Sequence, residues 1–196
     1  MEDQMVLALV IALTLGAGLI SASFFEWAVH KYLLHRPISY FKIWFEGHTR
    51  IHHMKFKFDH RYHLQHDDDK EIIDMKRWAL VLIGFGSLPY FVVMALFDFP
   101  HEWVMVLTGT ILSTLYYIAY EYLHWCMHLP KERRLEKSWL FRRLNGHHLL
   151  HHRFMGKNYN VVFPFADWCM GTLMARSTVH FKQPKGPFIA DVQPLS

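Results

Sequence analysis

The chain has 196 residues, of which 52% are hydrophobic and 16 are histidines, and its formal net charge at pH 7 is +4. This length favours one domain, residues 1–196. The positive charge does not indicate nucleic-acid binding, because the sequence has no nucleic-acid-binding motif and its basic residues flank long apolar runs. We interpret the charge as one that holds a protein surface against anionic lipid headgroups.

Three long apolar runs follow one another along the chain, and none of them contains a charged residue: Met5–Phe25, Trp78–Phe97 and Trp103–Tyr120. Each is about long enough to cross a hydrocarbon core of ~30 Å at ~1.5 Å per residue. Three buried core helices would leave too little polar chain to cover them. The sequence therefore predicts an all-α membrane protein with about three transmembrane helices, at about 5–27, 78–97 and 103–123.

The basic residues predict the orientation of these helices. All 21 Lys and Arg fall within residues 31–77 and 131–185, on either side of the second and third runs. The positive-inside rule places both stretches in the cytoplasm, with the N-terminus and the 98–103 turn on the other side. We therefore expect a multi-pass protein with a cytoplasmic helical cap. Pro89 predicts a kink in the second helix that packs or shapes a cavity.

Eleven histidines gather at the cytoplasmic ends of the predicted helices. We call their four clusters the first to fourth boxes, which in order are His30 and His35; His48, His52 and His53; His124 and His128; His147, His148, His151 and His152. The first and third runs continue directly into their boxes. Four separate segments of the chain thus bring imidazoles to the same level at the cytoplasmic side of the membrane.

The spacing within the boxes follows helical geometry in most cases. The third box is an i, i+4 pair on one helix face, and His48 and His52 form another such pair. His53 lies about 100° further around the same helix axis. The members of the fourth box at 148, 151 and 152 share a face within about 100° of arc. The first pair is five residues apart and does not share a face. Arg36-Pro37 breaks the helix there, so we expect His35 to turn inward from the helix end.

This density of imidazoles indicates a metal site. A lone histidine is usually a surface or hydrogen-bonded core residue, but packed imidazoles repel when protonated and need partners when buried. Neutral imidazole is a good ligand for iron, zinc, copper or nickel. Because zinc needs only about four ligands, ten or eleven histidines suggest two ions with four or five each.

The boxes also carry a family resemblance. HX4H, HX3HH, HX3H and HX2HH, in this order around apolar spans, resemble the fatty acid hydroxylase/sterol desaturase superfamily of integral-membrane di-iron enzymes. The stretch NYNVVFPFADWCMGT at 158–172 is similar to the family's Asn…Asp…Gly-Thr tail, so that the resemblance runs from about Glu26 to Leu173. It implies these ligands, with His147 as an additional candidate: His30, His35, His48, His52, His53, His124, His128, His148, His151 and His152.

The resemblance also implies the chemistry. We expect two iron ions (zinc in some isolated preparations), O2 as oxidant, a lipid or fatty acyl substrate, and no catalytic residues beyond the metal ligands. A separate electron donor, such as cytochrome b5 or ferredoxin, is expected because the chain contains no cytochrome b5 domain. The expected reaction is hydroxylation of an unactivated C–H bond. Desaturation and sterol or carotenoid hydroxylation remain alternatives. A non-enzymatic metal transporter or sensor is less favoured, because it would place ligands inside its spans.

Other polar residues near the boxes have open roles. Glu26 and Glu121 are interpreted as carboxylates that orient ligand imidazoles, or as interface charges. Asp167, in the tail motif, is expected to orient a ligand or to be structural. Three histidines lie in a charged loop that is expected to be solvated, with an extra ligand as the alternative, and two more are left outside the site: His60, His63 and His66, then His101 and His180.

Overall fold

The computed structural model describes residues 1–73 and 78–175, and every regular element in these ranges is helical. His180 lies outside the described residues. In chain order the elements are α1 (Glu2–Ala28), the π-helix η1 (Val29–Leu34), η2 (Ser39–Phe41), α2 (Lys42–Phe45), the π-helix η3 (Glu46–His52), α3 (His53–Lys55), η4 (His60–Tyr62), η5 (Asp67–Ile72), α4 (Ala79–Leu96), α5 (Glu102–His128), α6 (Trp139–Arg153) and α7 (Phe165–Cys169).

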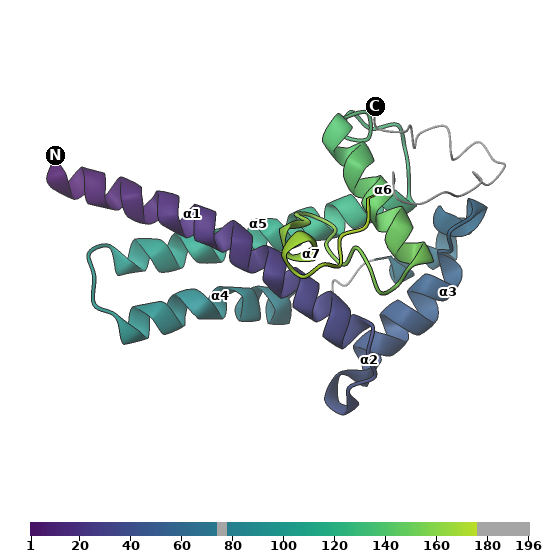
Figure 1. The fold of residues 1–196 in the computed structure, drawn as a ribbon, viewed down its shortest axis with the longest axis horizontal. Helices are drawn as coiled ribbons and strands as arrows, with labels where there is room; N and C mark the ends of the chain where they lie inside the picture. The colour runs from purple at the N-terminus through teal and green to yellow at the C-terminus, as the bar shows by residue number, and fades with distance from the viewer. Residues whose placement is uncertain (74–77, 176–196) are drawn as a thin grey trace.

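Three helices are long and apolar enough to cross a membrane: Glu2–Leu34, Ala79–Leu96 and Glu102–His128. The predicted number of such helices is therefore confirmed within the described residues. The first and third extend beyond their predicted ends: the first contains His30 and ends one residue before His35, and the third contains both members of the third box. Figure 1 shows the three helices extending together to one side, with α2, α3 and α6 gathered at the opposite end.

Helix α5 is the centre of this bundle, because it packs along both α1 and α4, whereas these two contact each other far less. The Tyr90 ring of α4 fills the space between α5 and α1. A Cβ added to Gly109 would lie 2.5 Å from that ring, and one added to Gly18 would lie 2.7 Å from its hydroxyl. Gly109 is thus required by the close approach of the Tyr90 ring, and Gly18 by the approach of both Leu112 and the Tyr90 hydroxyl. Tyr90 packs further against Met105 and Val106.

The N-terminus and the turn between α4 and α5 lie at the same end of the bundle, far from the boxes. There the His101 Nε2 lies 3.0 Å from an Asp3 carboxylate oxygen. The N-terminus and this turn therefore lie together, as predicted. Which end faces the cytoplasm remains a prediction.

The segment after α6 folds back onto α1 and ends in α7. The Ser23 hydroxyl donates to the Phe163 carbonyl at 2.5 Å and accepts from the Ala166 amide at 3.0 Å. The Trp27 indole donates to the Thr172 hydroxyl at 2.9 Å. These bonds hold residues 158–172 against the last turns of α1, directly beside the first box.

Candidate metal centre

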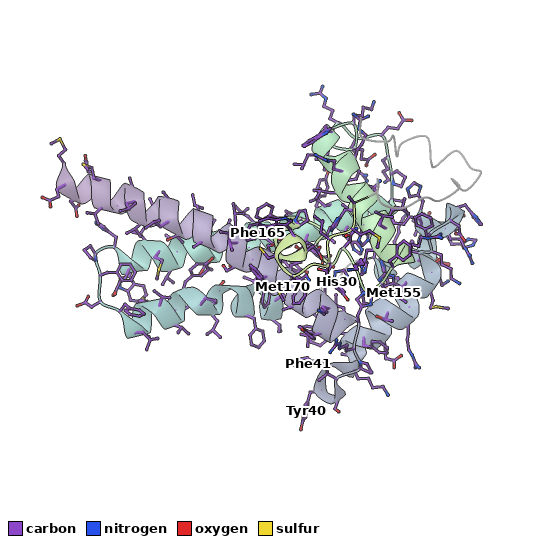
Figure 2. The ribbon with its side chains drawn as sticks, in the orientation of Figure 1. His30, Tyr40, Phe41, Met155, Phe165 and Met170 are labelled. Atoms are coloured by element: carbon purple, nitrogen blue, oxygen red, sulfur yellow. The ribbon has the colours of Figure 1, made fainter. Side chains whose placement is uncertain are left out.

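The ten histidines predicted as ligands form two groups of five. We call them centre 1 (His30, His35, His48, His53, His151) and centre 2 (His52, His124, His128, His148, His152). Within each group the candidate ligand atoms all lie within 4.8 Å of one another. All are buried except His35, which is half-buried. His30 lies where α1 meets the shorter helices, as Figure 2 shows.

A π-helix aligns the first box. His35 directly follows the π-helix Val29–Leu34, so it does lie at the helix end as expected. The expectation that His30 and His35 do not share a face is wrong, however, because their rings stack with centroids 5.1 Å apart. A π turn closes i to i+5 and therefore holds more residues than an α turn, which brings residues five apart to one side.

In the second box, His48 and His52 lie on another π-helix, Glu46–His52, and His53 begins α3. The box is divided differently from the prediction. The α-helical spacing paired His48 with His52. In the structure His48 joins His53, five residues on, in centre 1, while His52 belongs to centre 2. The wider turn is again the reason. The His48 and His52 rings still stack, at 5.1 Å between centroids, so they meet where the two centres adjoin.

The third and fourth boxes lie on α-helices and keep α-helical pairing. The third box, at the end of α5, contributes both imidazoles to centre 2. On α6, His148 and His152 are an i, i+4 pair in centre 2, while His151 turns to centre 1. Each histidine doublet, 52–53 and 151–152, therefore gives one side chain to each centre and joins the two.

The Nε2 atoms converge within centre 1. The His48 Nε2 lies 2.9 Å from that of His30 and 3.1 Å from that of His53. The His151 Nε2 lies 3.1 Å from that of His35 and 3.2 Å from that of His53. The five nitrogens thus form a continuous set of near neighbours.

Centre 2 has the same arrangement. The His148 Nε2 lies 3.1 Å from the Nε2 atoms of both His128 and His152. The His52 Nε2 is buried without a hydrogen-bond partner. The two centres adjoin, since the His53 and His152 rings are 4.3 Å apart between centroids.

The other ring nitrogen, Nδ1, fixes the tautomer of most of these imidazoles. In six histidines the Nδ1 faces a backbone carbonyl, which only accepts, so the proton must be on Nδ1: His30 to Tyr159, His52 to Ile72, His124 to Ile73, His128 to Tyr62, His151 to Lys157 and His152 to Phe56. In a seventh, His35, the Nδ1 lies 3.2 Å from the Thr49 hydroxyl. That hydroxyl already donates to the Leu34 carbonyl, so it accepts from His35.

The Nε2 atoms of these seven side chains therefore carry lone pairs, and two such lone pairs lie 3.1 Å apart in the His35–His151 pair. Two lone pairs about 3 Å apart make no hydrogen bond and repel. Nitrogens bound to one ion at about 2.1 Å, roughly 90–110° apart, would themselves lie roughly 3.0–3.4 Å apart. The observed spacing and tautomers consequently fit a bound metal ion in each centre, with carbonyls holding the outer nitrogens as in other histidine metal sites.

Burial keeps the imidazoles uncharged. It lowers the pKa values of His48, His52, His53, His148 and His152, and neighbouring imidazoles lower them further. The pKa of His35 is lowered to about 2 and that of His151 to about 4, in both cases chiefly by burial. At neutral pH these side chains are therefore in the form that binds metal.

A buried polar network holds the carbonyls that face centre 1. Asp167 accepts from the Tyr159 amide at 2.9 Å, the Asn160 amide at 2.8 Å and the Thr172 hydroxyl at 2.6 Å. Glu26 accepts from the Tyr116 hydroxyl at 2.7 Å and from the same loop, through the Asn160 side chain at 3.1 Å. Both carboxylates thus act on His30 indirectly, by fixing the loop whose Tyr159 carbonyl accepts from it. Glu121 is half-buried on α5.

The remaining candidates lie outside the two centres. The His147 Nε2 bonds to Asp167 at 3.1 Å, so this histidine supports the loop rather than joining either group. The hydrogen bonds from His147, the Thr172 hydroxyl and the Asn160 amide hold the pKa of the Asp167 carboxyl below its ordinary value, although its burial acts to raise it. His60 is exposed and His63 half-buried in the charged loop. Thr49 was not anticipated, because a threonine inside a helix gives no spacing signal.

An apolar cavity leads to centre 1 from between the long helices. Its empty volume is about 760 Å³, including the space at its mouth. Its lining runs from Ser21 to Leu34 on α1 and η1, from Leu82 to Tyr90 on α4 and from Ser113 to Tyr120 on α5. His30 is part of the lining, and so is Pro89, which lies inside α4. The cavity therefore joins the apolar bundle to a metal-binding group.

Over residues 1–73 and 78–175 the fold and site define an all-helical structure with three helices able to span a membrane and two histidine groups able to hold metal. No family model matches the chain, and neither a curated protein nor a solved structure matches it.

Proposed function

We propose that the chain is an O2-dependent membrane oxygenase with two iron ions, which hydroxylates an unactivated C–H bond of a lipid or fatty acyl chain. The observation that carries the proposal is the pair of adjoining five-histidine groups at the end of an apolar cavity. Two bound irons would supply, with O2, an oxidising power that protein side chains lack. The sequence resemblance to fatty acid hydroxylases supports the same reaction.

The chain's own contribution is to bring a lipid chain to the histidines. The cavity is lined by apolar side chains, among them Phe25, Val29 and Leu82, which suit a hydrocarbon chain. Phe85 and Pro89 on α4 and Ser21 on α1 are exposed at its edge, so the cavity is open on the side where α1 and α4 contact each other least. A lipid can therefore enter sideways from the bilayer.

The buried histidines keep water away from the reacting bond. Five of the ten histidines are 0–1% exposed: His30, His52, His128, His148 and His151. Their outer nitrogens are held mainly by backbone carbonyls, so that the rings are fixed before any ligand binds. This rigidity favours one position of attack along a bound chain.

The proposal includes a location and partners. By the positive-inside rule the histidine end faces the cytoplasm, where a separate electron donor, such as cytochrome b5 or ferredoxin, would supply two electrons. One oxygen atom of O2 then enters the C–H bond, and the other leaves as water with two protons. Basic residues around this end would attract a charged lipid headgroup.

The test is expression of the chain in a host supplied with 18O2, followed by lipid mass spectrometry. We expect a lipid product that carries one labelled oxygen. A product two mass units lighter and unlabelled would instead mean desaturation, and a labelled sterol or carotenoid would change the substrate class. Metal uptake or release with no lipid change, with any donor, would favour a transporter or sensor and refute the enzyme.

A control separates the site from the rest of the chain. His128→Ala, in centre 2, should abolish the product, because it removes a ligand that is fully buried. Its control is His101→Ala, at the opposite end of the bundle, which should leave the product unchanged. Equal yields from both variants would show that the histidine groups do not carry the reaction.

A further inference from the structure

We propose that Tyr90 is the end stop of a binding site for the methyl end of an acyl chain, so that the attacked carbon is counted from the methyl end rather than from the headgroup. This inference rests on the proposed function, since it assigns the chain-binding part of the same site. It commits to one occupant, the terminal segment of a single unbranched hydrocarbon chain.

The direction of the cavity supports this occupant. Helices α1 and α5 run toward the histidines and α4 runs away from them, so Ser21, Tyr90 and Ser113 mark one end of the cavity while His30, Leu82 and Tyr120 mark the other. The histidine end is at the polar part of the molecule. The Tyr90 end lies inside the bundle of long helices. At this depth in a bilayer, only the hydrocarbon tail of a lipid is present.

Packed side chains close the far end along the direction of the helices, whereas the opening at Ser21 and Pro89 is at the side of the bundle. Tyr90 is 8% exposed, and its ring lies against the bare backbone of Gly109 with its hydroxyl near Gly18. Beyond it, Met105 and Val106 continue the core. A chain that enters from the bilayer and passes toward Tyr90 therefore meets a floor, where its methyl group must stop.

The length of the cavity sets the distance from this floor to the histidines. Ser21 on α1 and His30 on η1 are nine residues apart, which corresponds to about 14 Å at ~1.5 Å per residue. An extended hydrocarbon with C–C bonds of about 1.5 Å covers this length with roughly ten carbon atoms. The attacked carbon should consequently lie roughly ten carbons from the methyl end, whatever the total length of the chain.

Substitutions at Tyr90 and Gly86 should change the length of the cavity in opposite directions. Tyr90→Ala would open the floor toward Gly18, three residues beyond Ser21 on α1, and deepen the cavity by about 4.5 Å. Gly86→Leu would fill the cavity wall, whereas Gly86→Ala fits, because an added Cβ meets Ser113 at an ordinary 3.5 Å. Gly86→Leu leaves the Tyr90 packing intact, so it tests the idea even if Tyr90→Ala does not fold.

The first experiment measures binding without turnover. The full chain in lipid nanodiscs is photolabelled with fatty acids that carry a diazirine at the methyl end, and the labelled peptides are mapped. We expect label around Tyr90 in the wild type, a shift toward Gly18 in Tyr90→Ala, and loss of label near Tyr90 in Gly86→Leu. Leu80 is 86% exposed and represents the lipid-facing surface. The assignment would be overturned if the label were confined to such residues and did not change in these variants.

The second experiment maps the oxidised carbon on chains of graded length. In the wild type its distance from the methyl end should stay constant, and Tyr90→Ala should lengthen that distance by roughly three or four carbons. Gly86→Leu should shorten it. Phe91→Ala, next to Tyr90 but 44% exposed and outside the cavity lining, is the control that should change nothing.

The two experiments separate this inference from the proposed function. Methyl-end label at Tyr90, with no lipid oxidised under any donor, would support the chain site and refute the oxygenase. Oxidation at a position counted from the headgroup, alike in the wild type and Tyr90→Ala, would support the oxygenase and refute the end stop.

Discussion

The division of ten histidines into two groups makes a sharp prediction about metal content. His151 and His152 are neighbours in sequence, but they belong to centres 1 and 2, as His53 and His52 do. We compare two double variants that share one change: His53→Ala with His151→Ala, and His53→Ala with His152→Ala. The first pair removes two ligands from one centre, and the second removes one from each.

The expected metal counts follow from the ligands that remain. Loss of even a group that only orients a ligand lowers metal affinity by about 10–100-fold, so loss of two ligands from one centre should exceed that. The His53/His151 variant keeps three ligands in centre 1 and five in centre 2, and should hold one ion. The His53/His152 variant keeps four in each, enough for a tetrahedral ion, and should hold two.

The assay is elemental analysis of the purified full chain after a brief exposure to chelator, with protein quantified by amino-acid analysis. Wild-type chain should contain two ions. Circular dichroism controls for folding of both variants. If the two variants lose the same amount of metal, or if the wild type binds one ion, the division into two five-histidine centres is wrong.

Three further predictions concern other parts of the molecule. His101→Ala should leave metal content unchanged, since this residue lies at the opposite end of the bundle; a loss of metal would place it in the site. A cysteine at Glu102 should be labelled from outside the cell and one at Lys157 should not, and the reverse pattern would overturn the positive-inside argument. Asp167→Asn should lower stability by about 2–3 kcal/mol in chemical denaturation, because buried donors lose a charged acceptor; an unchanged midpoint would contradict that role.

Much of the fold could be predicted from the sequence because two strong signals do not depend on tertiary detail. The uncharged runs predict three long helices, since only length and apolarity matter for crossing a bilayer, and three such helices are present. The histidine boxes likewise predict a metal site of ten or eleven imidazoles, because so many imidazoles have few other physical uses, and the family resemblance supplied the set of ten that the structure gathers. The loop at 158–172 was assigned a role only through a resemblance, and the structure places it beside the first box.

The division between the centres could not be predicted, because it depends on two π-helices. A periodicity of 3.6 residues pairs His48 with His52 and separates His30 from His35. The structure reverses both relations over Val29–Leu34 and Glu46–His52, where one extra residue fits into a turn. Such a bulge is stabilised by what surrounds it, here the Thr49 hydroxyl bonded to the Leu34 carbonyl. Local sequence alone carries no signal for it.

The carbonyls behind the imidazoles explain how the two centres can remain distinct while sharing histidine doublets. Those facing centre 1 come from residues 157–159, which Asp167 and Glu26 hold against α1. Those facing centre 2 come from residues 56–73, between α3 and α4. Because each centre is oriented by a different segment, a change in one loop can alter one set of imidazoles and leave the other in place. The apolar cavity opens beside His30 of centre 1, so it is the 157–172 loop that fixes the imidazole nearest to a bound chain.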